Sequence, residues 1–407
     1  MEETRMTIEA APLPTNRPNP FDPPEDYRIL RENQPIGRMV LADGSLGWVV
    51  TSYELVRFVL ADSRFSADGR KTTSPHRILP EAARKPRPGF FLQMDPPDHT
   101  RYRGLLTGQF TVRRMKALEP RIREHVTDTL DEMQRAGDSA DLVGSFARRL
   151  PSLMLCELLG VPYDERGDFQ RFTGGAPQTN LPRETAERSA QIGAALIATN
   201  EYVLSLVRRK RKQPGDDMLS GLMTADPTLT DEEIAGMGRL LLLAGHDTTA
   251  SMLSLGTFLL LQHPEQAAEI RRDPEAVNRA VEEIMRYLTV VQFGAFRAAT
   301  EDLEVGGQLV KAGETVVCSL AAANRDPRQF ADPDRLDVTR EHTPHLAFGH
   351  GAHFCVGAQL GRLEMRIGYR ELFTRLPRLR LAVPPQEIEI RTGSTIYALG
   401  SLPVTWS

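Results

Sequence analysis

The chain has 407 residues and a mass of 45.4 kDa, enough for two ordinary domains or for one large domain built around a cofactor. With 41% hydrophobic and 26% charged residues it has a globular composition, and its formal net charge of −4 lacks the basic excess of a general nucleic-acid-binding protein. Its three cysteines, Cys156, Cys318 and Cys355, are far apart and odd in number, so we expect no disulfide framework and a reducing compartment, the cytoplasm.

The N-terminal part begins with a proline-rich stretch. We interpret residues 1–24 as a leader and 25–407 as one folded domain. The leader has no basic stretch followed by an apolar one, so we expect neither a signal peptide nor a membrane anchor. In the segment 38–52, RMVLADGSLGWVVTS, an Asp-Gly pair lies between two apolar runs, which predicts a β-hairpin.

The middle of the chain, 113–288, is predicted to be mainly helical. The segment 230–233, TDEE, is typical of a helix start, and 213–215, QPG, is typical of a break. The most apolar stretch, 240–261, is interrupted by a glycine, a histidine, an aspartate and two threonines, which a lipid-facing helix would accommodate only at high cost. We therefore expect a buried helix there and no membrane span.

The last third of the chain changes to short β segments. These occupy 303–321, and they are followed by a loop, a helix from about Gly357 and terminal strands that end at 401–406, SLPVTW. No repeat and no linker interrupts the chain. The sequence predicts one mainly α domain with small β-sheets.

Two basic stretches stand out in this acidic chain. We interpret 207–217, VRRKRKQPGDD, as a solvated helix end. The stretch 99–118 carries five Lys or Arg and no acidic residue, so it is a candidate surface for an anionic partner.

Cys355 lies in the segment 348–357, FGHGAHFCVG, among glycines and histidines. Four of the nine histidines come just before it, at His342, His345, His350 and His353. One hypothesis is a zinc site in a zinc-stabilised binding protein, although structural zinc sites usually pair ligands at two separate places and often use several thiolates. A second is a catalytic cysteine paired with His353, because a nearby imidazole lowers the pKa of a thiol.

The third hypothesis is that Cys355 is the thiolate ligand of a haem iron. Glycines let the backbone pass close to the macrocycle and direct amides at the sulfur, and a thiolate favours O–O cleavage by donating electron density to iron. The pattern F-x-x-G-x-x-x-C-x-G resembles the haem-thiolate loop of the cytochrome P450 monooxygenases. The resemblance implies contacts with haem b from Phe348, Gly349, His353, Cys355 and Gly357.

Two other segments are similar to the structural motifs of that family. Glu283 and Arg286 match its E-x-x-R element, and PDRL at 333–336 matches its P-x-R-[FL] segment through Arg335. Taken alone, an acid and an arginine at this spacing are usually a solvated pair. The resemblance implies instead that the three side chains form a hydrogen-bonded network that fixes the structure around the cysteine loop.

The apolar helix carries AGHDTT at 244–249, which is similar to the family's [AG]-G-x-[DE]-T-T. The resemblance implies that Asp247 relays protons, that Thr248 holds dioxygen, and that Ala244 lies against the haem. The residues alone also allow the Thr248 hydroxyl to bond back to the carbonyl of Ala244 and bend the helix.

The two propionates of haem need cationic or donor partners if they are partly buried. The family pattern H-x-x-x-R is matched by His99 and Arg103. Arg297 and His353 match further propionate contacts of the bacterial branch.

The resemblance covers about 12–406 and is closest to soluble actinomycete-type members that tailor secondary metabolites. It implies hydroxylation or epoxidation of a lipophilic small molecule with dioxygen (O2), or desaturation or ring coupling as an alternative. It further implies a monomer that receives electrons from a separate ferredoxin and ferredoxin reductase. The implied pocket residues are Leu240, Leu243, Ala244, Val290, Val291 and Ile396. The implied docking residues are Arg101, Arg113, Arg114, Arg362 and Arg366.

Overall fold

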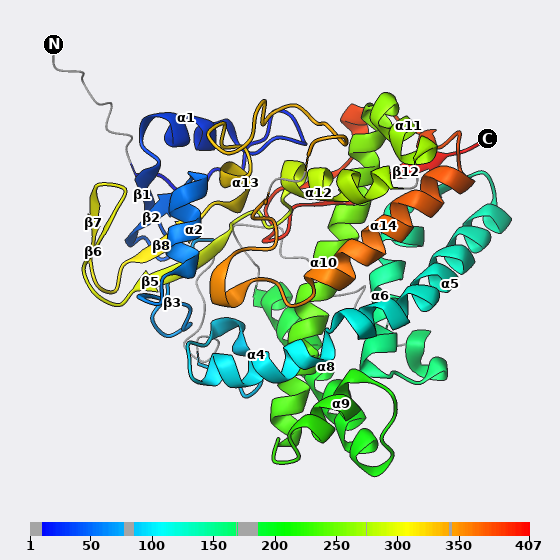
Figure 1. The fold of residues 1–407 in the computed structure, drawn as a ribbon, viewed down its shortest axis with the longest axis horizontal. Coiled ribbons are helices and arrows are strands. Elements are labelled where there is room, and N and C mark those ends of the chain that lie inside the picture. The colour runs from blue at the N-terminus through cyan, green and yellow to red at the C-terminus, as the bar shows by residue number, and fades with distance from the viewer. Residues whose placement is uncertain (1–9, 77–84, 168, 170–185, 274, 342–343) are drawn as a thin grey trace.

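The computed structural model describes residues 10–76, 85–167, 169, 186–273, 275–341 and 344–407. Helices make up one half of the molecule and a sheet-rich region makes up the other (Figure 1). The prediction of a mainly α protein with small β-sheets is confirmed. The C-terminus lies in the helical half, and the described N-terminal residues lie in the sheet-rich half.

Helices α1, α2 and α13 lie in the sheet-rich half (Figure 1). The α-helices are α1 (Glu25–Asn33), α2 (Tyr53–Ala61), α4 (Asp98–Gln109), α5 (Val112–Ala136), α6 (Arg149–Leu159), α8 (Ala186–Lys212), α9 (Met218–Ala225), α10 (Asp231–Gln262), α11 (Pro264–Arg272), α12 (Ala276–Leu288), α13 (Leu320–Ala323) and α14 (Ala358–Arg375). Single turns are η1 (Phe91–Gln93), η3 (Tyr163–Glu165), η4 (Gly351–His353) and η5 (Pro385–Glu387), and η2 (Val143–Ala147) is a π-helix.

The strands are short. They are β1 (Ile36–Val40), β2 (Leu46–Val50), β3 (Phe65–Ser66), β4 (Ser139–Asp141), β5 (Ala295–Ala299), β6 (Leu303–Val305), β7 (Gln308–Val310), β8 (Thr315–Cys318), β9 (Arg380–Leu381), β10 (Ile390–Arg391), β11 (Ala398–Leu399) and β12 (Pro403–Thr405). The largest sheet has the order β1-β2-β8-β5-β3, in which only β2 and β8 are parallel. The predicted hairpin is confirmed, since Ile36 pairs with Val50 and Gly44 has the positive φ of 84° that its turn requires.

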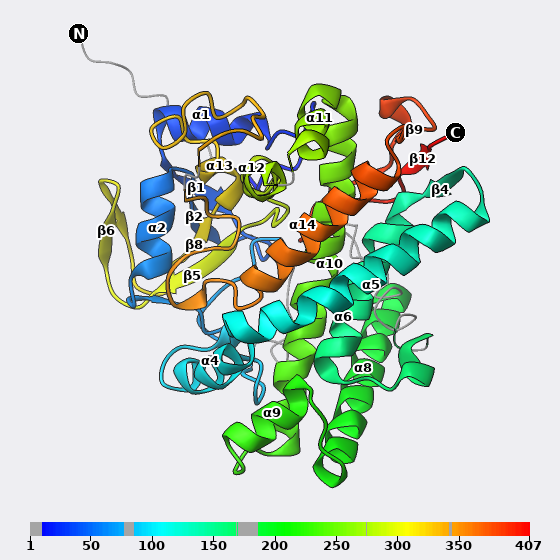
Figure 2. The ribbon, with the colours of Figure 1, turned by 45° about the vertical axis from the view of Figure 1, so that its right-hand side comes forward.

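Helix α10 crosses the helical half and is buried over most of its length (Figure 2). Its start is a capping box, in which the Thr230 hydroxyl accepts from the Glu233 amide and the Glu233 carboxylate accepts from the Thr230 amide. The predicted helix start is therefore confirmed. In the described part of the chain, no helix is long and apolar enough to cross a membrane.

The basic run at 207–217 ends α8 and is largely paired. Lys210 contacts Asp217 at 2.8 Å, and Arg209 and Arg211 pair with Glu165 and Asp231. The predicted break is confirmed, because α8 ends at Lys212.

The described part of the proline-rich stretch packs on the domain that follows it. Ala11 pairs with Met39, and Leu13 and Phe21 are buried. The guanidinium of Arg17 stacks over the ring of Tyr397 at 3.9 Å. This stretch therefore contributes to the core before α1 begins at Glu25.

Candidate active site

The three thiols differ in access. Cys156 and Cys318 are fully buried, and burial raises the pKa of each to about 12. Cys355 is accessible. The surrounding protein still desolvates the Cys355 thiol and raises its pKa, but the amide of Gly357 and the charges of Arg103 and Arg362 oppose that rise. Of the three thiols, only Cys355 combines access with groups that stabilise a thiolate.

The cysteine loop is held in a closed conformation that glycine makes possible. The amide of Cys355 donates to the carbonyl of Phe348 at 2.9 Å. Gly349 and Gly351 have φ of 72° and 71°, and a Cβ at Gly351 would lie 2.3 Å from the carbonyl oxygen of Leu60. The loop therefore lies directly against the end of α2, and this close approach requires glycine at 351.

The four predicted propionate ligands come together. His99 and Arg103 lie on α4, Arg297 on β5 and His353 in the cysteine loop. The rings of His99 and His353 lie 4.1 Å apart. Burial lowers the pKa of His353 to about 3, with further lowering by the positive charge of Arg297, by His99 and by Arg103.

This cluster is short of negative charge. Burial also lowers the pKa of His99, Arg103 and Arg297. His99 Nε2 is buried with no hydrogen-bond partner among the described residues. The charge of Asp95 raises the pKa of His99 and of Arg297, but burial outweighs it in both. Buried cations of this kind are stabilised by carboxylates, so the cluster fits the two propionates of haem b.

The exposed stretch of α10 lies around the predicted AGHDTT motif. Leu243 and Ala244 are exposed, whereas Leu241 and Leu242 before them are buried. The Thr248 hydroxyl donates to the carbonyl of Ala244 at 2.7 Å, which is the back-bond that the residues allowed. Burial would raise the pKa of Asp247, but the hydrogen bond with His246 and nearby positive charges lower it overall.

The proposed pocket residues differ in exposure. Val291 and Ile396 form an isolated β-bridge, which brings the segment after α12 together with the loop between β10 and β11. Leu240 and Val290 are buried in the core.

Glu283 and Arg286 of the E-x-x-R element are buried and hydrogen-bonded to each other. Arg286 donates to both carboxylate oxygens of Glu283, at 2.7 and 2.9 Å, and both side chains are 2% exposed. Arg286 also donates to the carbonyls of Asn324 and Pro333, each at 2.8 Å. The pair thus connects α12 to the two chain segments that precede the cysteine loop.

The prediction that the Arg335 side chain completes this network is wrong. Its guanidinium is 69% exposed and pairs with Asp337 at 2.9 Å, and only its backbone carbonyl faces Arg286. Arg340 takes the third place, donating to Glu283 at 3.1 Å. The physical reason is that the carboxylate of Asp337, two residues along, binds the Arg335 guanidinium at the surface. The side chain of Arg340 instead reaches Glu283.

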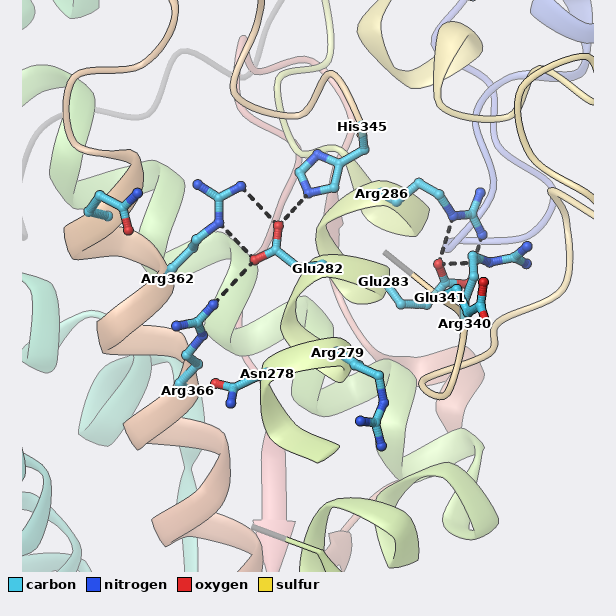
Figure 3. A pocket seen from close by; sticks show the side chains of 11 residues that line it. Asn278, Arg279, Glu282, Glu283, Arg286, Arg340, Glu341, His345, Arg362 and Arg366 are labelled. Carbon is cyan, nitrogen blue, oxygen red and sulfur yellow. Dashed lines mark hydrogen bonds and ion pairs between the residues drawn. The ribbon is translucent and has the colours of Figure 1, made fainter. Parts of the chain in front are cut away.

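A second network beside the first was missed by the sequence analysis. Glu282 accepts from Arg362 at 2.7 and 2.9 Å and contacts His345 at 3.2 Å, in a pocket of about 500 Å³ (Figure 3). Burial raises the pKa of Glu282, but His345 and Arg362 together bring it down to about 2. Arg362 also stacks over the ring of Phe348 at 4.5 Å, so this carboxylate joins α12, α14 and the cysteine loop.

The zinc hypothesis finds no support in the described residues. They contain no group of three or more potential ligands placed to hold a metal ion. His345 is bound to Glu282 and His353 packs on His99. His342 lies outside the described residues.

Glu364 is a further buried acid on α14. It is 3% exposed, its Oε2 has no hydrogen-bond partner in the described structure, and burial raises its pKa to about 8. It lines a small cavity of about 50 Å³ together with Thr249 and Gly357.

Replacing Glu364 by Gln is expected to flatten the pH dependence of stability. The folded pKa of Glu364 lies above its unfolded value of about 4.3, so its contribution to stability is fully present below pH 4.3 and is lost as pH rises through about 8. Between pH 5 and pH 8 the parent should lose about 3 kcal/mol that Glu364→Gln retains. Urea unfolding at both pH values measures this difference, and parallel pH profiles would contradict the assignment.

An accessible thiol in a glycine-rich loop, next to a cluster of two arginines and two histidines that fits two carboxylates, is the arrangement expected of a haem-thiolate site. The family model for cytochrome P450 matches residues 179–394. Cytochrome P450 105C1 of a Streptomyces species is 47% identical over 98% of this chain and 100% of its own length, and nocardicin C N-oxygenase of Nocardia uniformis subsp. tsuyamanensis is 45% identical over 97% and 98%. The crystal structure of CYP105P1 in complex with filipin I has a TM-score of 0.90 and 41% identity, over 98% of this chain and 99% of that one. The chain belongs to the cytochrome P450 family.

The protein is accordingly a cytochrome P450 monooxygenase that binds haem through a cysteine thiolate. The family uses dioxygen, a lipophilic substrate and separate redox partners.

Proposed function

We propose that this enzyme inserts one oxygen atom into a lipophilic small molecule, by hydroxylation or epoxidation, with Cys355 as the axial ligand. The observation that carries the proposal is the accessible Cys355 thiol beside the cluster of His99, Arg103, Arg297 and His353. The exposed apolar side chains of α10 and the filipin I complex of the similar protein support a lipophilic natural product as substrate.

The experiment is a screen of lipophilic natural products for a blue shift of the Soret band, followed by turnover of the responders under ¹⁸O2. Product that carries one ¹⁸O atom supports oxygen insertion. Product without the label from every responder would contradict it and would identify desaturation or ring coupling.

Bound haem b supplies the activation of dioxygen. The residues of the chain have separate tasks around it. The four basic side chains hold its carboxylates, and the loop from Phe348 to Gly357 orients the Cys355 sulfur and directs the Gly357 amide at it. Because the Thr248 hydroxyl donates to Ala244, its oxygen is free to accept a hydrogen bond and to position a proton donor, and Asp247 relays protons.

Removing the Thr248 hydroxyl is expected to uncouple the enzyme. In Thr248→Ala, product formed per reduced nicotinamide consumed should fall several-fold and hydrogen peroxide should rise, because no hydroxyl positions the proton donor. Asp247→Asn should slow turnover with less peroxide. Haem content and the substrate-induced spin shift should equal those of the parent, because neither side chain contacts the haem in this proposal.

The matched control is Thr257→Ala. Thr257 makes the same back-bond, to Leu253 at 2.7 Å, but is fully buried farther along α10. Normal coupling in Thr257→Ala and loss of coupling in Thr248→Ala would separate proton positioning from helix bending. Unchanged coupling in Thr248→Ala would remove Thr248 from the proposed function.

We further propose that an acidic ferredoxin, reduced by its reductase, docks over the N-terminal end of α5 and α14. Among the arginines implied for docking, Arg101 is paired with Glu233 at 2.8 Å and Arg362 with Glu282, so we do not choose these two for the test. The charge of Arg103 lowers the pKa of Cys355, so we assign Arg103 to the cofactor site and not to docking. Arg113 is exposed at the start of α5.

Arg113→Glu is expected to slow reduction by ferredoxin several-fold at low ionic strength and to have little effect at high salt, because salt screens exposed charges. Substrate affinity should not change. Stopped-flow reduction rates measure the effect, with Arg271→Glu on α11 as the charge-matched control. An equal loss at all salt concentrations, or in the control, would contradict electrostatic docking at this face.

A further inference from the structure

His246 and Asp247 form a side-chain pair on α10 that the sequence motif treats as one acid and one variable position. Nδ1 of His246 lies 3.0 Å from Oδ1 of Asp247, and Nε2 of His246 lies 3.1 Å from the carbonyl oxygen of Arg148, at the end of η2. His246 is 3% exposed. Both ring nitrogens are thus fixed between two oxygen atoms in the protein interior.

Each ring nitrogen of His246 has one oxygen atom as its partner. A backbone carbonyl only accepts, so Nε2 must carry a proton. A neutral imidazole protonated at Nε2 has no proton on Nδ1, and an ionised carboxylate has none either. The 3.0 Å contact with Asp247 is a hydrogen bond only if one additional proton lies between Nδ1 and Oδ1.

The surroundings of Asp247 carry several positive charges. Arg148, which directly follows η2, and Arg391 of β10 act on Asp247, and Asp141 acts on Arg148. Burial alone would raise the pKa of Asp247, but the hydrogen bond with His246 and these positive charges lower it. Two arrangements satisfy the contact: a doubly protonated ring beside an ionised carboxylate, or a neutral ring beside a protonated carboxyl.

Asp247 also borders a small cavity with a mixed polar and apolar lining. The cavity is about 20 Å³ in volume, enough for about one water molecule. Its polar lining residues are Asp247, Arg148, Ser251, Ser254 and Ser394, and the remaining lining residues are apolar. A water there would have polar partners and would lie against the carboxylate.

We propose that His246 is a positioning residue that stores a transferable proton for Asp247, so that the pair, and not the carboxylate alone, supplies protons beside Thr248. The proton shared between Nδ1 of His246 and Oδ1 of Asp247 passes from the carboxyl toward the Thr248 hydroxyl, and a water in the cavity beside Asp247 returns a proton to the pair through the carboxylate. No electrons move in this exchange. The catalytic part of this inference rests on the proposed function, whereas the stored proton does not.

Spectroscopy of a complex that does not turn over substrate tests for the stored proton. ¹⁵N NMR of the reduced carbon monoxide complex, which is diamagnetic, reports the protonation of both ring nitrogens, and His246→Gln assigns the signals. Two protonated nitrogens at pH 7 support the proposal. A neutral ring with an infrared band of a protonated carboxyl that disappears in Asp247→Asn also supports it. An unprotonated Nδ1 with no such band would overturn it.

The catalytic part is tested by pH profiles of product formation. Gln at position 246 can donate to the Arg148 carbonyl but has no transferable proton. His246→Gln should therefore slow coupled turnover about ten-fold, more strongly at high pH, and increase the solvent deuterium isotope effect. Thr257→Ala is the control on the same helix and should keep the parent's profile.

The outcomes separate this inference from the proposed function. A parental pH profile and isotope effect in His246→Gln would overturn the catalytic part even if Thr248→Ala uncouples the enzyme. Two protonated ring nitrogens together with normal coupling in Thr248→Ala would support the stored proton and would count against the role of Thr248 instead.

Discussion

Substituting Cys355 by His should remove the strongly red-shifted Soret band of the reduced carbon monoxide complex and replace it with the band of imidazole ligation. The shift arises from electron donation by a thiolate, and Cys355 is the accessible thiol of the three. We expect monooxygenase activity to fall to background. Spectra of the reduced carbon monoxide complex and product analysis measure the two effects.

The controls are Cys156→Ala and Cys318→Ala. Both thiols are fully buried in the core, with a pKa raised to about 12, so neither has a role as ligand. Both variants should keep the red-shifted band, at some cost in stability. A band that survives in Cys355→His, or that disappears in either control, would show that the ligand has been misassigned.

The second large effect concerns the network around Glu283. Arg340→Met should lower the free energy of unfolding by roughly 2–3 kcal/mol, because it leaves a buried carboxylate with one guanidinium instead of two. Haem content should fall with it, since the same network fixes the segments before the cysteine loop. Urea unfolding and the ratio of haem to protein measure the two effects.

Arg335→Met is the matched control, five residues earlier. The Arg335 side chain is exposed, so its loss should change stability by less than about 0.5 kcal/mol. The two variants remove the same charge and the same functional group. A larger loss in Arg335→Met than in Arg340→Met would contradict the arrangement described for this network.

The sequence predicted those features that depend on residues close together in the chain. The hairpin turn at Gly44, the cap at Thr230 and the glycines around Cys355 each reflect a local requirement of the backbone. The prediction that His99, Arg103, Arg297 and His353 would gather came from the family resemblance. Their distance along the chain gives no local signal of it.

The features that the sequence did not predict concern the direction of side chains. Arg335 and Arg340 lie in one loop, and no spacing rule distinguishes the one that turns inward. Glu282 precedes Glu283 and has the pattern of a solvated face, yet it binds Arg362 and His345, which are 80 and 63 residues away. The contacts of His246 were missed for a similar reason, because a variable motif position carries no expectation of a partner.

The close contact of Gly351 with Leu60 has a practical consequence for handling the enzyme. The cysteine loop lies against α2 in the sheet-rich half, while α14, which follows the loop directly, packs in the helical half. The proposed cofactor site therefore lies between the two halves, because Arg297 belongs to the sheet-rich half and His99 and Arg103 to α4. We expect that a preparation which has lost its colour on storage has also lost the alignment of its two halves, so that adding haem back restores activity only after refolding.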